Sequence, residues 1–117
     1  MPFEYKQGGF ANQSARLDQV APNVRAFMKD SFSTSSKGPI TAGFFRLEKD
    51  KASSIPYDFD EVKCFIEGEC TISDETGAKV TARAGDIILF RKGTVATFQC
   101  ETDTHALAFY CAQRAKL

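Results

Sequence analysis

The sequence predicts an all-β domain, either a sandwich or a small antiparallel barrel, on three observations. From Ile40 onward the chain consists of short runs rich in β-branched and aromatic residues, without helical periodicity. Turn residues interrupt these runs at 74–77, 84–85 and 92–93. Helices that could connect parallel strands are missing, so a parallel α/β sheet is excluded.

The chain before this β-rich part is predicted to form a separate arm, over residues 1–38. It is polar, with two glycines at 8–9 and a serine-rich stretch at 31–36 that is typical of a loop. Pro22 predicts the start of one short helix, because Val24, Phe27 and Met28 have the spacing of an apolar helical stripe. The barrel itself is expected over residues 39–117.

The turn residues divide the barrel into its strands. They separate a run at 69–73 from one at 78–83, and they place further boundaries before 86–91 and before 94–100. In chain order we expect seven strands, near residues 40–48, 57–67, 69–73, 78–83, 86–91, 94–100 and 104–112.

Composition excludes several classes of function. The 117 residues suffice for one domain, and 15 Lys and Arg balance 15 Asp and Glu, so we expect no binding to nucleic acid or to a membrane. No signal peptide or membrane-spanning run is recognisable, which predicts a cytoplasmic protein. The four cysteines, at 64, 70, 100 and 111, form no CxxC pair and have no nearby histidine, so we expect reduced, packed thiols.

Two motifs indicate a family. The segment 55–69 resembles the first cupin motif, with six residues between Glu61 and Gly68. The segment 85–96 resembles the second, with glycines at 85 and 93 and Arg91 at the usual proline position. The chain is most similar to the small EutQ-like cupins of the ethanolamine-utilisation type, in a stand-alone form of the kind found in fungi, and the segment His105–Cys111 resembles the last strand of that group.

The resemblance implies the cupin fold and a homodimer, but not the usual metal chemistry. Metal-binding cupins have two histidines shortly before the glutamate, where this chain has Ser54 and Pro56 or Ile55 and Tyr57. The third histidine position is Ala96. One carboxylate is a poor site for a metal that prefers imidazole, so we expect neither a metal nor another cofactor.

Strand alternation identifies candidate site residues inside the barrel. Since side chains alternate between faces, Tyr57, Phe59, Glu61, Lys63 and Phe65 are expected on one side, which cupin resemblance assigns to the interior. A glutamate and a lysine two residues apart in a partly dry cavity can serve as an acid or base, or form a structural ion pair. Glu61 is the expected acid or base, and Lys63 is expected to set its pKa and stabilise an anion.

Further candidates come from other strands. His105, the single histidine, is a reserve proton carrier if it lines the cavity. Arg46 is a candidate for binding an anionic group, although alternation alone does not fix its direction. The ligand-binding wall is expected to include Ala96, Phe98 and Cys100.

The leading hypothesis is a metal-independent cupin that binds a small, partly apolar or aromatic metabolite, with dehydration, isomerisation or cyclisation as its acid–base chemistry. A binding or accessory protein without catalysis is an equal alternative. A residual metalloenzyme using Glu61, His105 and Cys100 ranks below these. An acetate kinase activity, which the EutQ resemblance implies, ranks low because no glycine-rich phosphate loop is present.

Overall fold

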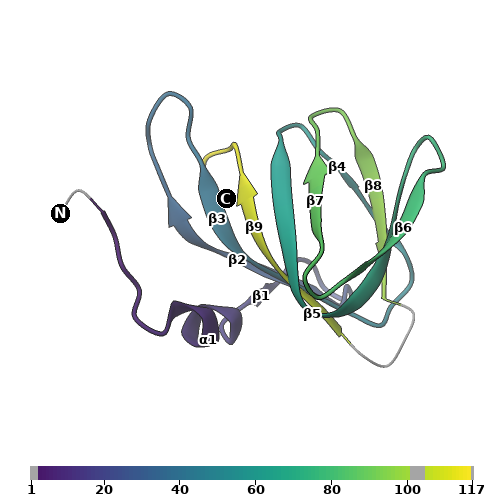
Figure 1. Ribbon diagram of the computed structural model, residues 1–117, viewed down its shortest axis with the longest axis horizontal. Coiled ribbons are helices and arrows are strands. Elements are labelled where there is room, and N and C mark those ends of the chain that lie inside the picture. Colours follow the sequence, from purple (N-terminus) through teal and green to yellow (C-terminus); the bar gives the residue numbers. More distant parts are fainter. Residues whose placement is uncertain (1–2, 101–104, 117) are drawn as a thin grey trace.

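The computed structural model describes residues 3–100 and 105–116, in which nine antiparallel strands form one curled sheet (Figure 1). None of the helices in these residues is long and apolar enough to cross a membrane. The elements in chain order are α1 (Gly9–Ser14), β1 (Asp18–Gln19), β2 (Ala26–Ser33), β3 (Thr41–Glu48), β4 (Ser53–Pro56), β5 (Glu61–Asp74), β6 (Lys79–Arg83), β7 (Ile87–Phe90), β8 (Val95–Gln99) and β9 (His105–Ala112).

The long strand β5 connects the two halves of the sheet. The strand order is β1-β2-β3-β9-β5-β8-β4, and β6 and β7 also pair with β5. The first part of β5 pairs with β7 and β9, and its second part pairs with β6 and β8. Figure 1 shows the result: β2, β3 and β9 form one wall, and β4, β6 and β8 form the other.

Gly68 allows β5 to turn from one half of the sheet to the other. Its φ of 70° lies in the left-handed region, where residues with a side chain are strained. A Cβ atom here would also overlap the carbonyl oxygen of His105. The register between β5 and β9 shifts beside this point, between Phe65 and Glu67. The predicted strands 57–67 and 69–73 are therefore parts of one strand, which begins at Glu61.

The core lies on the inner face of the curled sheet. Strand β9 contributes small alanines at 106, 108 and 112 and the fully buried Tyr110 to this face. Aromatic rings from other strands complete the packing, including a stacked pair of Tyr57 and Phe90 with centroids 4.8 Å apart. Small residues on one strand thus leave room for the rings of its neighbours.

The predicted all-β cupin fold with a short N-terminal helix is confirmed, but the predicted place of the helix is wrong. The helix is Gly9–Ser14, whereas Phe27 and Met28 lie in strand β2, which pairs with β3 along its length. The helical spacing of the apolar residues is overridden by this pairing. Strands β1, β2 and β4 were not predicted, while the runs at 40–48, 78–83, 86–91, 94–100 and 104–112 correspond to β3, β6, β7, β8 and β9. Residues 1–2 of the predicted arm, residue 104 of the last predicted strand and residue 117 lie outside the described residues.

Candidate functional site

A cavity of about 420 Å³ lies against the inner face of the sheet. Its wall is mostly apolar and comes from β2 to β5, β8, β9, the loops before β2 and before β5, and Arg114. The apolar lining consists of Val20, Val24, Ala26, Met28, Phe45, Leu47, Ile55, Pro56, Phe59 and Phe98. The polar side chains that reach it are Ser53, Ser54, Tyr57, Glu61, Lys63, Tyr110 and Arg114.

Glu61 and Lys63 form a buried ion pair in the cavity wall. Both are almost fully buried, at 4% and 3% exposure, and both point inward because they are two residues apart on β5. Lys63 Nζ donates a hydrogen bond to Glu61 Oε2. The Tyr57 hydroxyl donates to the same oxygen at 3.0 Å and accepts from Lys63 Nζ at 3.2 Å. A carboxylate, an ammonium and a phenol are therefore in mutual hydrogen-bond contact.

Backbone hydrogen bonds hold Tyr57 in this position. Residues 57–60 lie between β4 and β5 and are not part of either strand. The Tyr57 N–H donates to the Thr94 carbonyl at 2.8 Å, and the Gly93 N–H donates to the Tyr57 carbonyl at 2.7 Å. The turn that contains the second motif glycine thus fixes a side chain that precedes the first motif glutamate.

Aromatic rings surround the Lys63 ammonium. Five ring centroids lie between 4.9 and 5.7 Å from Nζ, those of Phe45, Tyr57, Phe90, Phe98 and Tyr110. The negative faces of aromatic rings attract a cation at such distances. Tyr57 and Phe98 were expected near the site, whereas no role was predicted for Phe45, Phe90 or Tyr110.

Burial shifts the pKa values of two members of this cluster, Lys63 and Tyr57. It lowers the pKa of Lys63, and the Glu61 carboxylate opposes that shift. It also raises the pKa of Tyr57 well above its usual range, and the negative charge of Glu61 adds to the effect. Tyr57 is therefore a neutral hydrogen-bond donor over the physiological range, while the proton of Lys63 is held less tightly than that of an exposed lysine.

A second polar cluster consists of Asp30 of β2, Tyr110 of β9 and Arg114, and it reaches the cavity through Tyr110 and Arg114. Arg114 makes a bidentate contact with Asp30, at 3.0 and 3.1 Å, and the Tyr110 hydroxyl donates to Asp30 Oδ1 at 2.6 Å. The Arg114 guanidinium also lies over the rings of Phe59 and Tyr110. These polar residues were missed in the sequence analysis. The available signal was a glycine inside a predicted strand, Gly43, since such a glycine can mark the close approach of another group. A Cβ atom at that position would lie 2.6 Å from the Tyr110 hydroxyl.

Two predicted polar site residues lie outside the cavity. His105 is on the outer face of β9, where its Nε2 is 2.7 Å from Glu67 Oε1. Arg46 donates to Glu48 Oε2 at 3.0 Å and does not reach the cavity. Alternation in β9 and β3 explains both placements, since Tyr110 and Phe45 occupy the inward positions. The expectation that His105 serves as a cavity proton carrier is corrected accordingly.

The remaining candidates divide between the cavity and the core. Phe59 and Phe98 line the cavity as expected. Phe65, Ala96 and Cys100 are buried in the core and do not line it. The Cys100 thiol donates to the Glu69 carbonyl at 3.6 Å, in a different part of the interior.

The side chains present do not fit the transition metal of many cupins. Glu61 is the single metal-binding side chain at the positions that correspond to cupin ligands, and its carboxylate accepts hydrogen bonds from Lys63 and Tyr57. A cation of the protein thus already lies at this carboxylate. In residues 3–100 and 105–116 no group of three or more His, Cys, Asp and Glu side chains is placed to hold a metal ion.

Comparisons with known proteins agree with this fold. The structure is similar to a putative ethanolamine utilization protein Q from Salmonella typhimurium, with a TM-score of 0.64 and 25% identity over 78% of this chain and 71% of that one. It is also similar to the Clostridium difficile EutQ protein, with a TM-score of 0.66 and 24% identity over 86% and 70% of the two chains. The Schizosaccharomyces pombe Cnp3 cupin domain shares the fold at 10% identity, with a TM-score of 0.68 over 87% and 69%.

The sequence comparison is more specific. No curated protein matches the chain. The family described as ethanolamine utilisation protein EutQ matches residues 7–115, which is almost the whole sequence. The chain therefore belongs to the EutQ family and has a cupin fold.

Proposed function

We propose that this protein binds a small, neutral, largely apolar organic molecule in the cavity. The observation that carries the proposal is a cavity of about 420 Å³ whose apolar wall includes the buried cluster of Glu61, Lys63 and Tyr57. Most ligand sites combine apolar walls with a few oriented polar groups in this way. The volume suits a molecule with one ring or a short branched chain.

Charge balance favours a neutral ligand. The charged side chains that line the cavity are each paired: Glu61 with Lys63, and Arg114 with Asp30, which is not itself part of the wall. A charged ligand would have to separate one of these pairs, and breaking a buried pair is strongly unfavourable. A carbonyl or hydroxyl oxygen avoids this cost. Among the described residues, Glu61 and Tyr57 accept two of the three N–H donors of Lys63, so one donor is available to such an oxygen.

Acid–base catalysis is the second candidate function. It is favoured by the direct contact of a carboxylate, an ammonium and a phenol at the end of the cavity. Glu61 would take or give the proton, and Lys63 would stabilise an anion that forms on the substrate. Dehydration, isomerisation and cyclisation are the reactions that need these two roles without a redox cofactor.

Native mass spectrometry of freshly purified protein, with elemental analysis in parallel, tests the binding proposal. We expect a stoichiometric organic mass and no transition metal. Val24→Trp fills the cavity wall and should abolish binding, whereas Val95→Trp, at an exposed position outside the wall, should retain it. Equal binding by both variants would place the ligand elsewhere, and one metal ion per chain would overturn the metal-independent proposal.

We also propose that the protein is a homodimer. Its outer sheet face carries exposed apolar side chains on neighbouring strands, with Val62 of β5 opposite Leu89 of β7 and Phe109 on β9. Such a face gains from being covered. The same native spectra report the subunit number, and Val62→Glu should shift the population to monomer. A wild-type monomer at micromolar concentration would contradict this proposal.

A further inference from the structure

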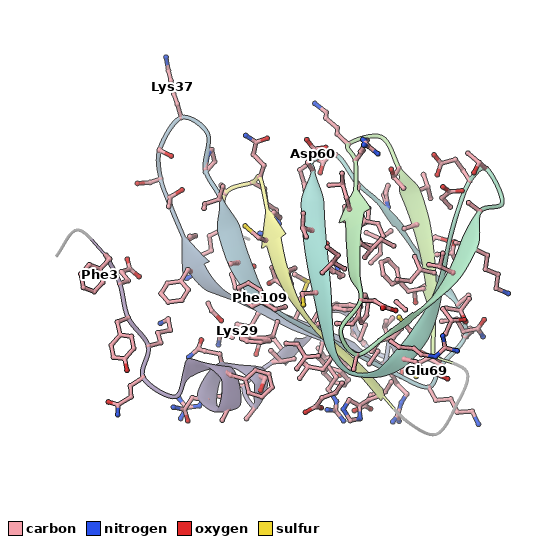
Figure 2. The ribbon with its side chains drawn as sticks, in the orientation of Figure 1. Phe3, Lys29, Lys37, Asp60, Glu69 and Phe109 are labelled. Atoms are coloured by element: carbon pink, nitrogen blue, oxygen red, sulfur yellow. The ribbon has the colours of Figure 1, made fainter. Side chains whose placement is uncertain are left out.

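Lys63 differs from every other lysine of the chain in its surroundings. The other eight lysines are exposed, such as Lys37, which projects from the loop between β2 and β3 (Figure 2). Lys63 is 3% exposed and forms part of the cavity wall. An amine in the wall of an apolar cavity is placed to react with a molecule held there. Lys6 also lines a hollow, of about 300 Å³, but it is an exposed lysine and its amine makes no hydrogen bond to a carboxylate among the described residues.

A nucleophilic amine must first lose a proton, and the contacts of Lys63 provide for this. Glu61 Oε2 accepts a hydrogen bond from Nζ, so the proton has a direct acceptor. Burial lowers the pKa of Lys63, and the positive charge of Arg114 acts in the same direction, while Glu61 and the Cys70 thiol act against it. The hydroxyl of Tyr57 faces the amine at 3.2 Å and the ring of Tyr110 faces it at 5.7 Å, and both phenols have raised pKa values and stay neutral.

We infer that Lys63 condenses with a small aldehyde or ketone in the cavity to form an imine, with Glu61 carrying the protons. The inference rests on the proposed function, because it concerns the same cavity and a neutral carbonyl ligand. It specifies the ligand class and adds a covalent step. Lysines in apolar surroundings are the usual residues for such chemistry in proteins.

The steps balance with the groups present. Lys63 gives one proton to Glu61, and its neutral nitrogen attacks the carbonyl carbon while the C=O π electrons move to the oxygen. Glu61 protonates that oxygen and takes a proton back from nitrogen, which gives a carbinolamine. Glu61 then protonates the hydroxyl group, water leaves, and the nitrogen lone pair forms the C=N bond. The products are one water molecule, a protonated imine on Lys63 and an ionised Glu61.

The surroundings of Lys63 suit both the free lysine and the protonated imine. The site begins with one positive nitrogen and one carboxylate, and it ends with the same two charges. The five rings that attract the ammonium also attract the protonated imine, because both are cations centred on the same nitrogen. The aromatic cage therefore does not oppose the reaction.

Reductive trapping tests the inference on the full chain. Purified protein is incubated with one equivalent of benzaldehyde and sodium cyanoborohydride, and tryptic peptides are then mapped for a benzyl group on lysine. We expect Lys63 to carry at least about tenfold more label than any exposed lysine, because the cavity holds the aldehyde beside its amine. Lys63→Arg keeps the positive charge but has no amine to label, so it should show only the low background of the exposed lysines. Val24→Trp, which fills the cavity, should lower the label at Lys63 in a protein that keeps the whole cluster.

The outcomes separate the imine from the binding proposal. Native spectra without reductant report whether benzaldehyde and its non-carbonyl analogue benzyl alcohol bind. Binding of both compounds with Lys63 unlabelled would overturn the imine and leave the binding proposal standing. Label spread evenly over the exposed lysines would also overturn the imine. Neither compound bound and no label at Lys63 would count against both. Since Lys63→Arg needs to fold for its result to be read, circular dichroism accompanies each variant, and the residue-level map of the wild type decides the question by itself.

Discussion

Replacing Glu61 by glutamine should destabilise the protein by an amount that depends on pH. The change leaves the Lys63 ammonium buried among five rings without its carboxylate. Removing one partner of a buried ion pair costs about 3–5 kcal/mol. The buried lysine can avoid this cost by losing its proton. At pH 7, which is 3.5 units below the ordinary lysine pKa of 10.5, deprotonation costs about 5 kcal/mol, and this sets an upper limit on the stability that Glu61→Gln can lose.

The sign of the pH dependence follows from the same limit. In the variant, folded Lys63 has a lowered pKa, so the unfolded chain binds more protons and stability rises with pH. The wild type shares the direction, but Glu61 opposes the shift there, so the rise is steeper in the variant. At pH 9 the limit falls to about 2 kcal/mol. The loss caused by Glu61→Gln should therefore be clearly smaller at pH 9 than at pH 7.

Urea unfolding at pH 7 and pH 9, followed by circular dichroism, measures both losses. Glu67→Gln is the matched control, because Glu67 lies on the same strand but contacts His105 on the outer face at 46% exposure. This control should lose no more than about 1 kcal/mol. Equal losses for the two variants at pH 7, or a Glu61→Gln loss that does not change with pH, would refute the reasoning.

Three further predictions concern the fold around the site. Gly68→Ala should lower the free energy of unfolding in urea by more than about 4 kcal/mol, because the added methyl group would meet backbone atoms. Gly77→Ala, at a positive φ with open space around it, should lower it by about 1–2 kcal/mol, and similar losses for the two variants would contradict the role of Gly68. Burial raises the pKa of the Cys70 thiol to about 12, so iodoacetamide at pH 8 should label the half-buried Cys64 of the native protein well before Cys70. Equal labelling rates for the two thiols, measured by mass spectrometry, would be inconsistent with this. Tyr57 has a raised pKa in the folded state, so above about pH 10 the unfolded chain loses this proton first and stability falls as pH rises. In Tyr57→Phe the urea midpoint should fall less steeply with pH than in the wild type, and an unchanged slope would argue against this reasoning.

Local alternation explains why part of the site could be predicted. Residues 61, 63 and 65 share one face of a strand whatever it pairs with, and the structure has these three side chains buried while Val62 is exposed. The cupin resemblance assigned this face to the interior. The same reasoning could not orient Arg46, because its direction depends on the register between β3 and its neighbours.

The parts that were missed depend on contacts between distant segments. Asp30 and Arg114 are 84 positions apart, so no local pattern predicts their contact. The helical spacing of Val24, Phe27 and Met28 predicts a helix, and only the pairing of β2 with β3 decides for a strand. Pairing energy between strands is not visible in a single segment.

Because of these distant contacts, the N-terminal segment is part of the candidate site. Val24 and Met28 form part of the cavity wall, and Asp30 on β2 holds Arg114 from the C-terminal end in place over Phe59. Asp30 balances the positive charge of Arg114, and that charge is one of those that lower the pKa of Lys63. A residue of β2 thus contributes to the electrostatics of a lysine on β5, although these two strands do not pair with each other.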